Sequence, residues 1–256
     1  MRRARVAYAG AVHEAVVAAD GLNLTLADGR VVAEDAVVWL PPVTPRTIYA
    51  LGLNYADHAA ELAFKPPEEP LIFLKGVGSL VGHKALTRRP ADATQMHYEC
   101  ELAVVIGKAA RNVPWERAYD VVGGYTVAND YTIRDYLENY YRPNLRVKNR
   151  DGGTPLGPWI VDRDDVADPM DLRLTTRVNG AVVQEGTTAD MVFGIPYLIE
   201  HLTSFMTLLP GDLILTGTPH GVVYLRPGDV IETEVEGVGA LTNTVVDDAT
   251  FYGASR

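Results

Sequence analysis

The chain has 256 residues, a formal net charge of −10 and a single cysteine, and its pI is about 5.0. The acidic balance argues against nucleic acid and anionic membranes as partners, and one thiol excludes a disulfide framework and cysteine-type zinc sites. No apolar run approaches the roughly 20 residues that span a bilayer, and His13 and Glu14 interrupt the first apolar stretch, so we expect neither a membrane span nor a signal peptide and place the protein in the cytoplasm.

Residues 1–45 have the pattern of a small β unit. Short strand-like runs alternate with two turn signals, Asp20-Gly21 and Asp28-Gly29. The run PPVTP at residues 41–45 cannot continue a sheet and favours a linker. We therefore expect a small N-terminal β domain over 1–45 and a catalytic domain over 46–256, and we find no catalytic constellation in the first of them.

A strand followed by a short helix is predicted next. Residues 48–53 are mainly apolar, Asn54 is a favourable N-cap, and the alanine-rich stretch after it extends to Phe64 before two prolines. On this helix His58 and Glu61 are three residues apart and are neighbours on one face. Such a pair can pass a proton or place a water, because the carboxylate orients and strengthens the imidazole base. The spacing alone favours the alternative, a surface ion pair.

The stretch HYECELAVVIG at residues 97–107 predicts a strand that ends at a glycine. Side chains alternate along a strand, so Glu99 and Glu101 point to one side and Cys100 to the other, where we expect a small core residue. Two carboxylates on one face repel each other and lose water, which is tolerable where that face meets solvent or a cation. A half-exposed strand and a cation site therefore both remain open.

A third acid follows at the end of another predicted strand. The run YTVAND ends at Asp130, and YTIRDYLENYYR after it predicts a helix over residues 131–142. Functional residues often lie at such a junction between a strand and a helix. The alternative is that Asp130 merely caps the helix.

Two loops supply positive charge and hydroxyl groups. Residues 141–158 form a Gly/Pro-interrupted basic loop in an otherwise acidic chain, which can receive substrate carboxylates or simply lie in solvent. The turn LTGTPHG offers backbone N–H groups and the hydroxyls of Thr216 and Thr218 to an anion, unless it is a plain turn. We also expect a hairpin over 172–184 and an amphipathic helix over 194–208. The basic side chains of the first loop are Arg142, Arg146, Lys148 and Arg150.

The motifs that are missing exclude several classes of chemistry. The chain has neither a P-loop nor a GxGxxG fingerprint, so nucleotide cofactors have no support, and it has no GxSxG for a serine triad. What remains is Glu99, Glu101 and Asp130, three hard oxygen ligands of the kind that suits Mg²⁺ or Mn²⁺. A metal held in this way can act as a Lewis acid on a carbonyl and stabilise an enolate.

An ordered set of motifs resembles the fumarylacetoacetate hydrolase family over about residues 46–245. The motifs are ALGLNYADHAAEL, MHYECEL, GYTVANDYTIRD, the K-x₂-D-x₂-T-P-L-G-P run that begins at Lys148, and LTGTPHG. The resemblance implies an α+β fold, a mixed roll of β-sheets with short helices, that is normally dimeric. The roles that it implies are a divalent metal, usually Mg²⁺, on Glu99, Glu101 and Asp130, a pocket position for Lys148, a lid helix that carries His58 and Glu61, and substrate contacts for Arg134 and Thr218.

Two longer segments, FKPPEEPLIFLK and DYLENYYRPNLRVKNRDG, resemble the metal-bearing half of the bifunctional members of homoprotocatechuate (4-hydroxyphenylacetate) breakdown. This implies decarboxylation of 5-carboxymethyl-2-oxo-hex-3-ene-1,7-dioate, isomerisation of 2-hydroxyhepta-2,4-diene-1,7-dioate, or both, with Arg142 or Arg146 helping to hold substrate carboxylates. Leu137 stands where some relatives carry a glutamine, so their oxaloacetate or acylpyruvate specificity is not implied.

The resemblance also leaves alternatives and sets the expected partners. The alternatives are an acylpyruvate hydrolase, an oxaloacetate decarboxylase and, from another class, a non-catalytic small-molecule-binding protein. The expected small-molecule partner is a 2-oxo dicarboxylate or tricarboxylate substrate. The expected protein partner is a second copy of the chain in a homodimer, or alternatively a paralogous module in a hetero-complex.

Overall fold

The computed structural model describes residues 1–61, 65, 67–137 and 145–253. Strands dominate it, as the many short β-type runs predict. In chain order the strands are β1 (Arg2–Tyr8), β2 (Ala11–Val17), β3 (Asn23–Leu26), β4 (Val31–Ala33), β5 (Val38–Leu40), β6 (Ile48–Gly52), β7 (Leu71–Lys75), β8 (Leu80–Val81), β9 (Leu86–Arg88), β10 (Met96–His97), β11 (Cys100–Ile106), β12 (Val122–Asn129), β13 (Thr132–Ile133), β14 (Thr154–Asp162), β15 (Arg173–Val178), β16 (Ala181–Thr187), β17 (Leu213–Leu215), β18 (Val230–Val235) and β19 (Gly239–Val246).

The helices are short and lie between strands or at the end of the chain. They are α1 (Ala56–Glu61), α2 (Leu145–Lys148), α3 (Ile195–Phe205) and α4 (Asp248–Tyr252), together with the 3-10 turns η1 (Glu34–Ala36), η2 (Val77–Ser79), η3 (Trp115–Val121), η4 (Arg134–Tyr136), η5 (Arg163–Asp165) and η6 (Thr188–Asp190). None of these described helices is both long and apolar enough to cross a membrane.

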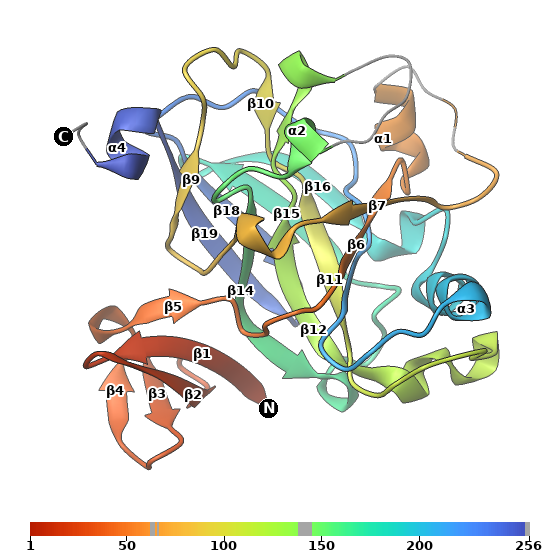
Figure 1. The fold of residues 1–256 in the computed structure, drawn as a ribbon, viewed down its shortest axis with the longest axis horizontal. Helices are drawn as coiled ribbons and strands as arrows, with labels where there is room; N and C mark the ends of the chain where they lie inside the picture. The colour runs from red at the N-terminus through yellow and green to blue at the C-terminus, as the bar shows by residue number, and fades with distance from the viewer. Residues whose placement is uncertain (62–64, 66, 138–144, 254–256) are drawn as a thin grey trace.

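Two sheets make up most of the molecule. The larger has twelve strands in the order β4-β3-β2-β1-β14-β12-β11-β17-β6-β7, with β5 on β1 and β8 on β14, and the smaller has the order β16-β15-β18-β19-β9. Figure 1 shows β1–β5 gathered at one corner of the fold. They join the rest through β1, which pairs with β14 at Arg2↔Val161 and Arg3↔Ile160. The predicted hairpin over 172–184 is the β15–β16 pair.

The fully buried strand β11 separates two apolar cores. Its side chains alternate as the sequence predicts: Leu102 and Val104 join a core with α3 and the smaller sheet, whereas Ala103 and Val105 join a core with β6 and β17. Cys100 lies in the first core, which confirms its expected structural role. Glu99 and Glu101 alternate with Cys100 and Leu102 along the strand, so their side chains point to the opposite side, away from that core.

Three local expectations were wrong. Asn54 does not cap the helix after it, because its side-chain oxygen accepts from the backbone N–H of Phe193 at 2.9 Å instead of from the first turn of the helix. The predicted helix after Asp130 is instead β13, paired with β10, and then η4; residues 138–144 lie outside the described part. The basic loop at 141–158 contains the helical turn α2 and the first half of β14. In each case tertiary contacts outweigh local propensity.

Candidate active site

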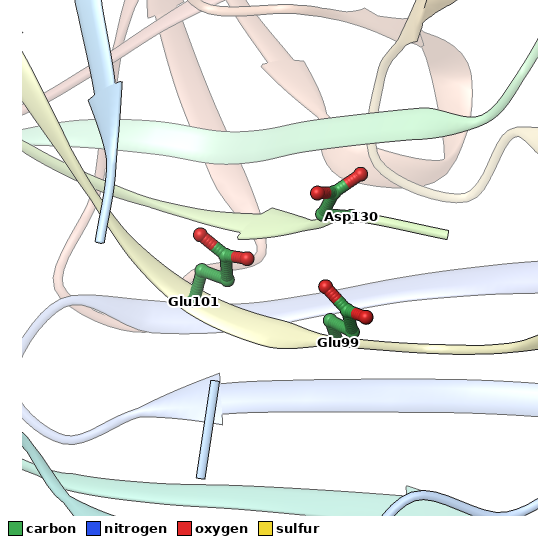
Figure 2. A group of neighbouring side chains, drawn as sticks. All are labelled: Glu99, Glu101 and Asp130. Carbon is green, nitrogen blue, oxygen red and sulfur yellow. The ribbon is translucent and has the colours of Figure 1, made fainter. Parts of the chain in front are cut away.

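The antiparallel pairing of β11 with β12 brings the three acids together. Cys100 pairs with Asn129 and Glu101 with Ala128, and the backbone N–H of Asp130 donates to the carbonyl oxygen of Glu99 at 2.9 Å. Figure 2 shows the three carboxylates around a common space, with Asp130 at the end of the neighbouring strand. One oxygen from each lies within 4.8 Å of the others. Oxygens on one Mg²⁺ or Ca²⁺ ion are separated by distances of this order, since each lies about 2.0–2.6 Å from the metal.

The acids are buried, so the alternative of a half-exposed polar strand is excluded. Glu99 is 5% exposed, and Glu101 and Asp130 are fully buried. Glu101 Oε2 accepts from the backbone N–H of Gly217 at 2.7 Å, but Glu101 Oε1 is buried without a hydrogen-bond partner among the described residues. Burial and the charges of Asp130 and Glu99 raise the pKa of Glu101 well above its usual range. An orphaned carboxylate oxygen in an oxygen-only donor set fits a hard divalent cation.

Two buried lysines contact the other two acids. Lys148 Nζ, at the end of α2, donates to Glu99 Oε2 at 2.6 Å and to Asp130 Oδ2 at 2.8 Å. Lys75 Nζ, at the end of β7, donates to Asp130 Oδ1 and to the carbonyl oxygen of Lys148 at 2.7 Å. Burial opposes the charged form of Lys148, but Asp130 and Glu99 outweigh it and raise the pKa of that amine. The lysines therefore orient two of the candidate ligands and connect them to α2.

Glu99 is further constrained from β13 and η4. Thr132 Oγ1 donates to Glu99 Oε1 at 2.8 Å, and Arg134 Nη2 lies 3.4 Å from the same oxygen. Arg134 Nε also donates to His97 Nε2 at 2.9 Å. Burial raises the pKa of Glu99, but the positive charges of Lys148 and Arg134 outweigh it and hold that pKa well below its usual range. Glu99 is thus ionised at neutral pH.

The helix α1 carries a histidine–carboxylate pair over the site. His58 Nδ1 lies 2.9 Å from Glu61 Oε2, and His58 is only 4% exposed whereas Glu61 lies at the surface, so the pair is half-buried instead of lying wholly at the surface. Glu61 Oε1 accepts from the backbone N–H of Gly221 at 3.0 Å, and His220 Nδ1 lies 2.7 Å from Asp57 Oδ2. In this structure α1 is therefore docked on the turn after β17.

Some of these groups line a cavity of about 130 Å³, whereas Glu61, Glu101 and Asp130 are not part of its lining. Its polar wall contains His58, Glu99, Arg134, Lys148 and Thr218. The remaining lining is glycine or apolar and consists of Leu51, Gly52, Leu53, Leu71, Ile72, Phe73, Leu137 and Val147. The arrangement combines a polar end, where carboxylates and a cation can bind, with an apolar wall that can exclude water from a bound ligand.

The remaining predicted substrate contacts are placed differently. Thr218 Oγ1 accepts from Gln184 Nε2 at 3.1 Å, which leaves its O–H free to donate into the cavity. Arg146 lies apart from this cavity, with its side chain 65% exposed and its guanidinium 3.9 Å from the ring centre of Tyr136. Arg142 lies outside the described residues.

Two residues of the site were missed in the sequence. Lys75 ends the run LIFLK, and a lysine that closes an apolar strand is a weak signal of a buried charge. His97 begins the acid-bearing stretch, but its contact with Arg134 spans 37 residues. The backbone N–H groups of the LTGTPHG turn were expected to face an anion, and one of them binds the carboxylate of Glu101.

The sequence of this chain matches a known protein family over most of its length. The family model described as fumarylacetoacetate (FAA) hydrolase C-terminal matches residues 47–246. The chain is 56% identical over 230 residues to the 4-hydroxyphenylacetate degradation bifunctional isomerase/decarboxylase of Salmonella dublin, covering 88% of this chain and 53% of that protein. It is 59% identical over 204 residues to the homoprotocatechuate catabolism bifunctional isomerase/decarboxylase of Escherichia coli, covering 80% and 47%. The chain therefore spans about half the length of these relatives.

Solved structures agree with the fold over almost the whole chain. A 5-carboxymethyl-2-hydroxymuconate delta-isomerase from Mycobacterium smegmatis is 40% identical with a TM-score of 0.86, and covers 97% of this chain and 99% of its own. A 2-hydroxyhepta-2,4-diene-1,7-dioate isomerase from Mycobacterium marinum is 36% identical with a TM-score of 0.82 over the same shares. These similarities confirm the expected α+β fold of mixed sheets and short helices.

Proposed function

We propose, from the premise that this chain belongs to the fumarylacetoacetate hydrolase family, that it is a divalent-metal-dependent enzyme of 4-hydroxyphenylacetate catabolism. Its reactions would be the decarboxylation of 5-carboxymethyl-2-oxo-hex-3-ene-1,7-dioate, the isomerisation of 2-hydroxyhepta-2,4-diene-1,7-dioate, or both. The observation that carries the proposal is one cavity lined by Glu99, Lys148, Arg134 and His58 with two further carboxylates beside Glu99. The similarity to bifunctional isomerase/decarboxylases supports the choice of substrate.

The proposed metal ligands are Glu99, Glu101 and Asp130, and the metal is Mg²⁺ or Mn²⁺. Their separation and the unpartnered Glu101 Oε1 support this assignment. When bound, such a cation supplies Lewis-acid polarisation of the 2-oxo acid group. The protein contributes the fixed positions of the ligands, because Lys75 and Lys148 orient Asp130 while Thr132 and Lys148 orient Glu99.

The charges around the site match the reaction. The acids Glu99, Glu101 and Asp130 are balanced by the bases Lys75, Lys148 and Arg134. A divalent cation would leave two positive charges. The triacid brings three carboxylates, and when one of them leaves as neutral CO₂ its negative charge moves onto the keto oxygen, so an anionic substrate and product would be attracted to this excess of positive charge. Lys148 lines the cavity and contacts two of the proposed metal ligands, so its charge can offset the negative charge on the keto oxygen, while Arg134 can receive a substrate carboxylate; in a buried site such preorganised charges favour the transition state.

His58 is the proposed proton carrier. Glu61 accepts from Nδ1–H of His58, so the lone pair of the neutral ring lies on Nε2. That nitrogen can take the proton of the 2-hydroxyl group of the hydroxydiene, and the imidazolium can deliver a proton to C5, which gives the 2-oxo-3-ene isomer. The docking of α1 on the turn at Gly221 keeps this pair at the cavity while bulk water is excluded.

A second candidate, acylpyruvate hydrolysis, is favoured by one observation. The apolar wall that includes Leu51, Leu53 and Leu137 suits an uncharged acyl chain better than a carboxylate. In that reaction His58 Nε2 would take a proton from the attacking water. The relative kcat/KM of the triacid and of an acylpyruvate separates the two candidates.

The assembly and the location of the protein belong to the same proposal. We propose a homodimer in the cytoplasm. A hetero-complex with a paralogous module is the alternative. Multi-angle light scattering of the purified chain at several concentrations tests the first arrangement.

Direct turnover of the triacid tests the function. The purified chain with Mg²⁺ is given 5-carboxymethyl-2-oxo-hex-3-ene-1,7-dioate, while CO₂ release and both product species are followed. We expect CO₂ release that stops with a chelator and returns with Mg²⁺. Turnover of the hydroxydienedioate alone would assign the isomerase. Failure with both substrates, or Glu101→Ala retaining near wild-type turnover after chelation, would refute the proposal.

A further inference from the structure

His97 lies beside the cavity residue Arg134, on the short strand β10 that pairs with β13. It ends β10, pairs with Thr132 of β13 and forms an isolated bridge with Tyr224. Its side chain is 1% exposed, and it does not line the cavity. The ring lies between the backbone of Tyr98 and the guanidinium of Arg134.

The two neighbours of the ring determine which nitrogen carries the proton. His97 Nδ1 lies 2.9 Å from the carbonyl oxygen of Tyr98, which can only accept, so Nδ1 carries a hydrogen. Arg134 Nε lies 2.9 Å from His97 Nε2, and a guanidinium can only donate, so Nε2 is a bare acceptor. His97 is therefore a neutral acceptor in a fixed tautomer and a fixed orientation.

A neutral acceptor suits Arg134 better than a carboxylate would. Bonding through Nε fixes the plane of the guanidinium and leaves its terminal N–H groups for Glu99 and the cavity. A carboxylate at position 97 would fix the same plane but would neutralise the charge of Arg134. The imidazole holds the arginine and leaves its positive charge available to an anionic ligand.

We propose that His97 is a positioning residue that aims Arg134 at the second carboxylate of a 2-oxo dicarboxylate, and so makes the site selective for diacids over monoacids. The inference rests on the proposed function for the assignment of Arg134 to a substrate carboxylate. It can nevertheless be tested independently of that function, because it concerns which ligand binds more tightly and requires no turnover.

Two amide substitutions separate positioning from general structural support. Glutamine at position 97 places its side-chain oxygen near the site of Nε2, so His97→Gln keeps an acceptor for Arg134. Asparagine places its amide near Nδ1 and falls short of Arg134, so His97→Asn loses that acceptor while remaining polar. The two variants are matched in chemistry and differ in reach.

The experiment measures the binding of 2-oxoadipate and 2-oxohexanoate in the presence of Mg²⁺ by calorimetry. These ligands share the 2-oxo acid end and the six-carbon length, and only the first has a distal carboxylate. We expect the wild type to prefer the diacid, His97→Gln to keep that preference within about threefold, and His97→Asn to lose about tenfold of it, the size of one charge-assisted hydrogen bond. Arg134→Leu should lose the preference, and adding His97→Asn to it should change nothing further.

The outcomes distinguish this inference from the proposed function. A global loss of folding lowers the binding of both ligands, whereas the inference concerns their ratio within one folded variant. A wild type that prefers the diacid but does not turn over the triacid would refute the function and leave the inference standing. No preference in the wild type, an unchanged preference in His97→Asn, or equal losses in both amide variants would overturn the inference.

Discussion

The backbone N–H of Asp130 donates to the carbonyl oxygen of Glu99 at 2.9 Å, so the sheet itself sets the distance between two of the three clustered acids. Side-chain flexibility has little part in bringing them together, since both are buried and held by charged or hydroxyl donors. Glu101 differs from them, because one of its oxygens has no partner among the described residues. A cation would therefore change the surroundings of Glu101 most.

Removing the charge of Glu101 should separate metal binding from folding. In Glu101→Gln we expect Mg²⁺ affinity to fall at least about 100-fold, while the metal-free protein keeps or gains thermal stability, because a buried and poorly compensated carboxylate is removed. Thermal unfolding with and without Mg²⁺ measures both effects. Glu185→Gln, at an exposed position, is the control and should keep the metal-induced shift. A full shift in Glu101→Gln would contradict the ligand assignment.

Lys75 should matter although it is absent from the cavity lining. It donates to Asp130 and to the carbonyl oxygen of Lys148, so Lys75→Met breaks a buried ion pair and frees the end of α2. Losing one partner of such a pair costs about 3–5 kcal/mol, and because Lys75 orients the proposed ligand Asp130 we expect metal affinity to fall by about 10–100-fold. Denaturant unfolding and metal titration measure these effects. The exposed Lys108→Met should show neither, and a wild-type metal affinity in Lys75→Met would refute the orienting role.

The sequence predicts those features of the site that depend on neighbouring residues better than those that depend on residues far apart in the chain. The alternation of Glu99, Cys100 and Glu101 follows from the period of a strand, and the structure preserves it. The approach of Asp130 depends on the pairing of β11 with β12, which no local pattern specifies. Side-chain contacts such as Lys75 with Asp130, 55 residues apart, are further beyond reach.

The helix expected after Asp130 does not form, again because of contacts between residues far apart in the chain. Its residues have acceptable helix propensity, but Thr132 and Ile133 pair with β10 and place Arg134 beside His97. Pairing in a buried sheet gains more than the few tenths of a kcal/mol per residue that separate helix propensities. The hairpin over 172–184 was predictable because a two-residue Asn-Gly turn is itself a local signal.

His58 should act in the chemical step and leave metal binding intact. His58→Gln removes the titrating nitrogen but keeps a polar side chain, so we expect isomerisation to slow by about 10²–10⁴-fold with an unchanged metal-induced thermal shift. Glu61→Gln should produce a smaller loss, because the amide still contacts the ring without stabilising its charged form. Pre-steady-state proton exchange at the substrate carbons measures the step. Wild-type exchange in His58→Gln would exclude it as the carrier.

Arg134 and Arg146 form a matched pair of arginines with different expected effects. Arg134 lines the cavity, so Arg134→Ala should raise the KM for a dicarboxylate substrate by about 10-fold or more. Arg146 lies over Tyr136 and near Asp92 with a largely exposed side chain, so Arg146→Ala should change KM less than about threefold. Steady-state kinetics on both variants tests this. A comparable rise in both would mean that Arg146 also contacts the substrate.

Acid should destabilise the fold through His83, away from the active site. Burial, reinforced by the charge of Lys84, lowers the pKa of His83 to about 4, and His83 Nδ1 accepts from the backbone N–H of Thr242 at 3.0 Å, which requires a neutral nitrogen. The folded-state pKa lies below the unfolded value of about 6.5, so between these two values the unfolded chain binds more protons. The stability that His83 contributes is therefore present above pH 6.5 and is lost as the pH falls towards 4.

The change in slope with pH tests this role. His83→Asn keeps an acceptor near Nδ1 but does not titrate, so the fall in unfolding free energy between pH 6.5 and 4 should be smaller by about 1–3 kcal/mol. Unfolding is followed in chelator, so that metal binding does not contribute. The slope is compared instead of the absolute stability, because the substitution also removes packing against Trp39. His201→Asn on α3, where the ring is partly exposed and stacks on Tyr197, is the control; an equal change of slope in both variants would show that His83 is not the buried base responsible.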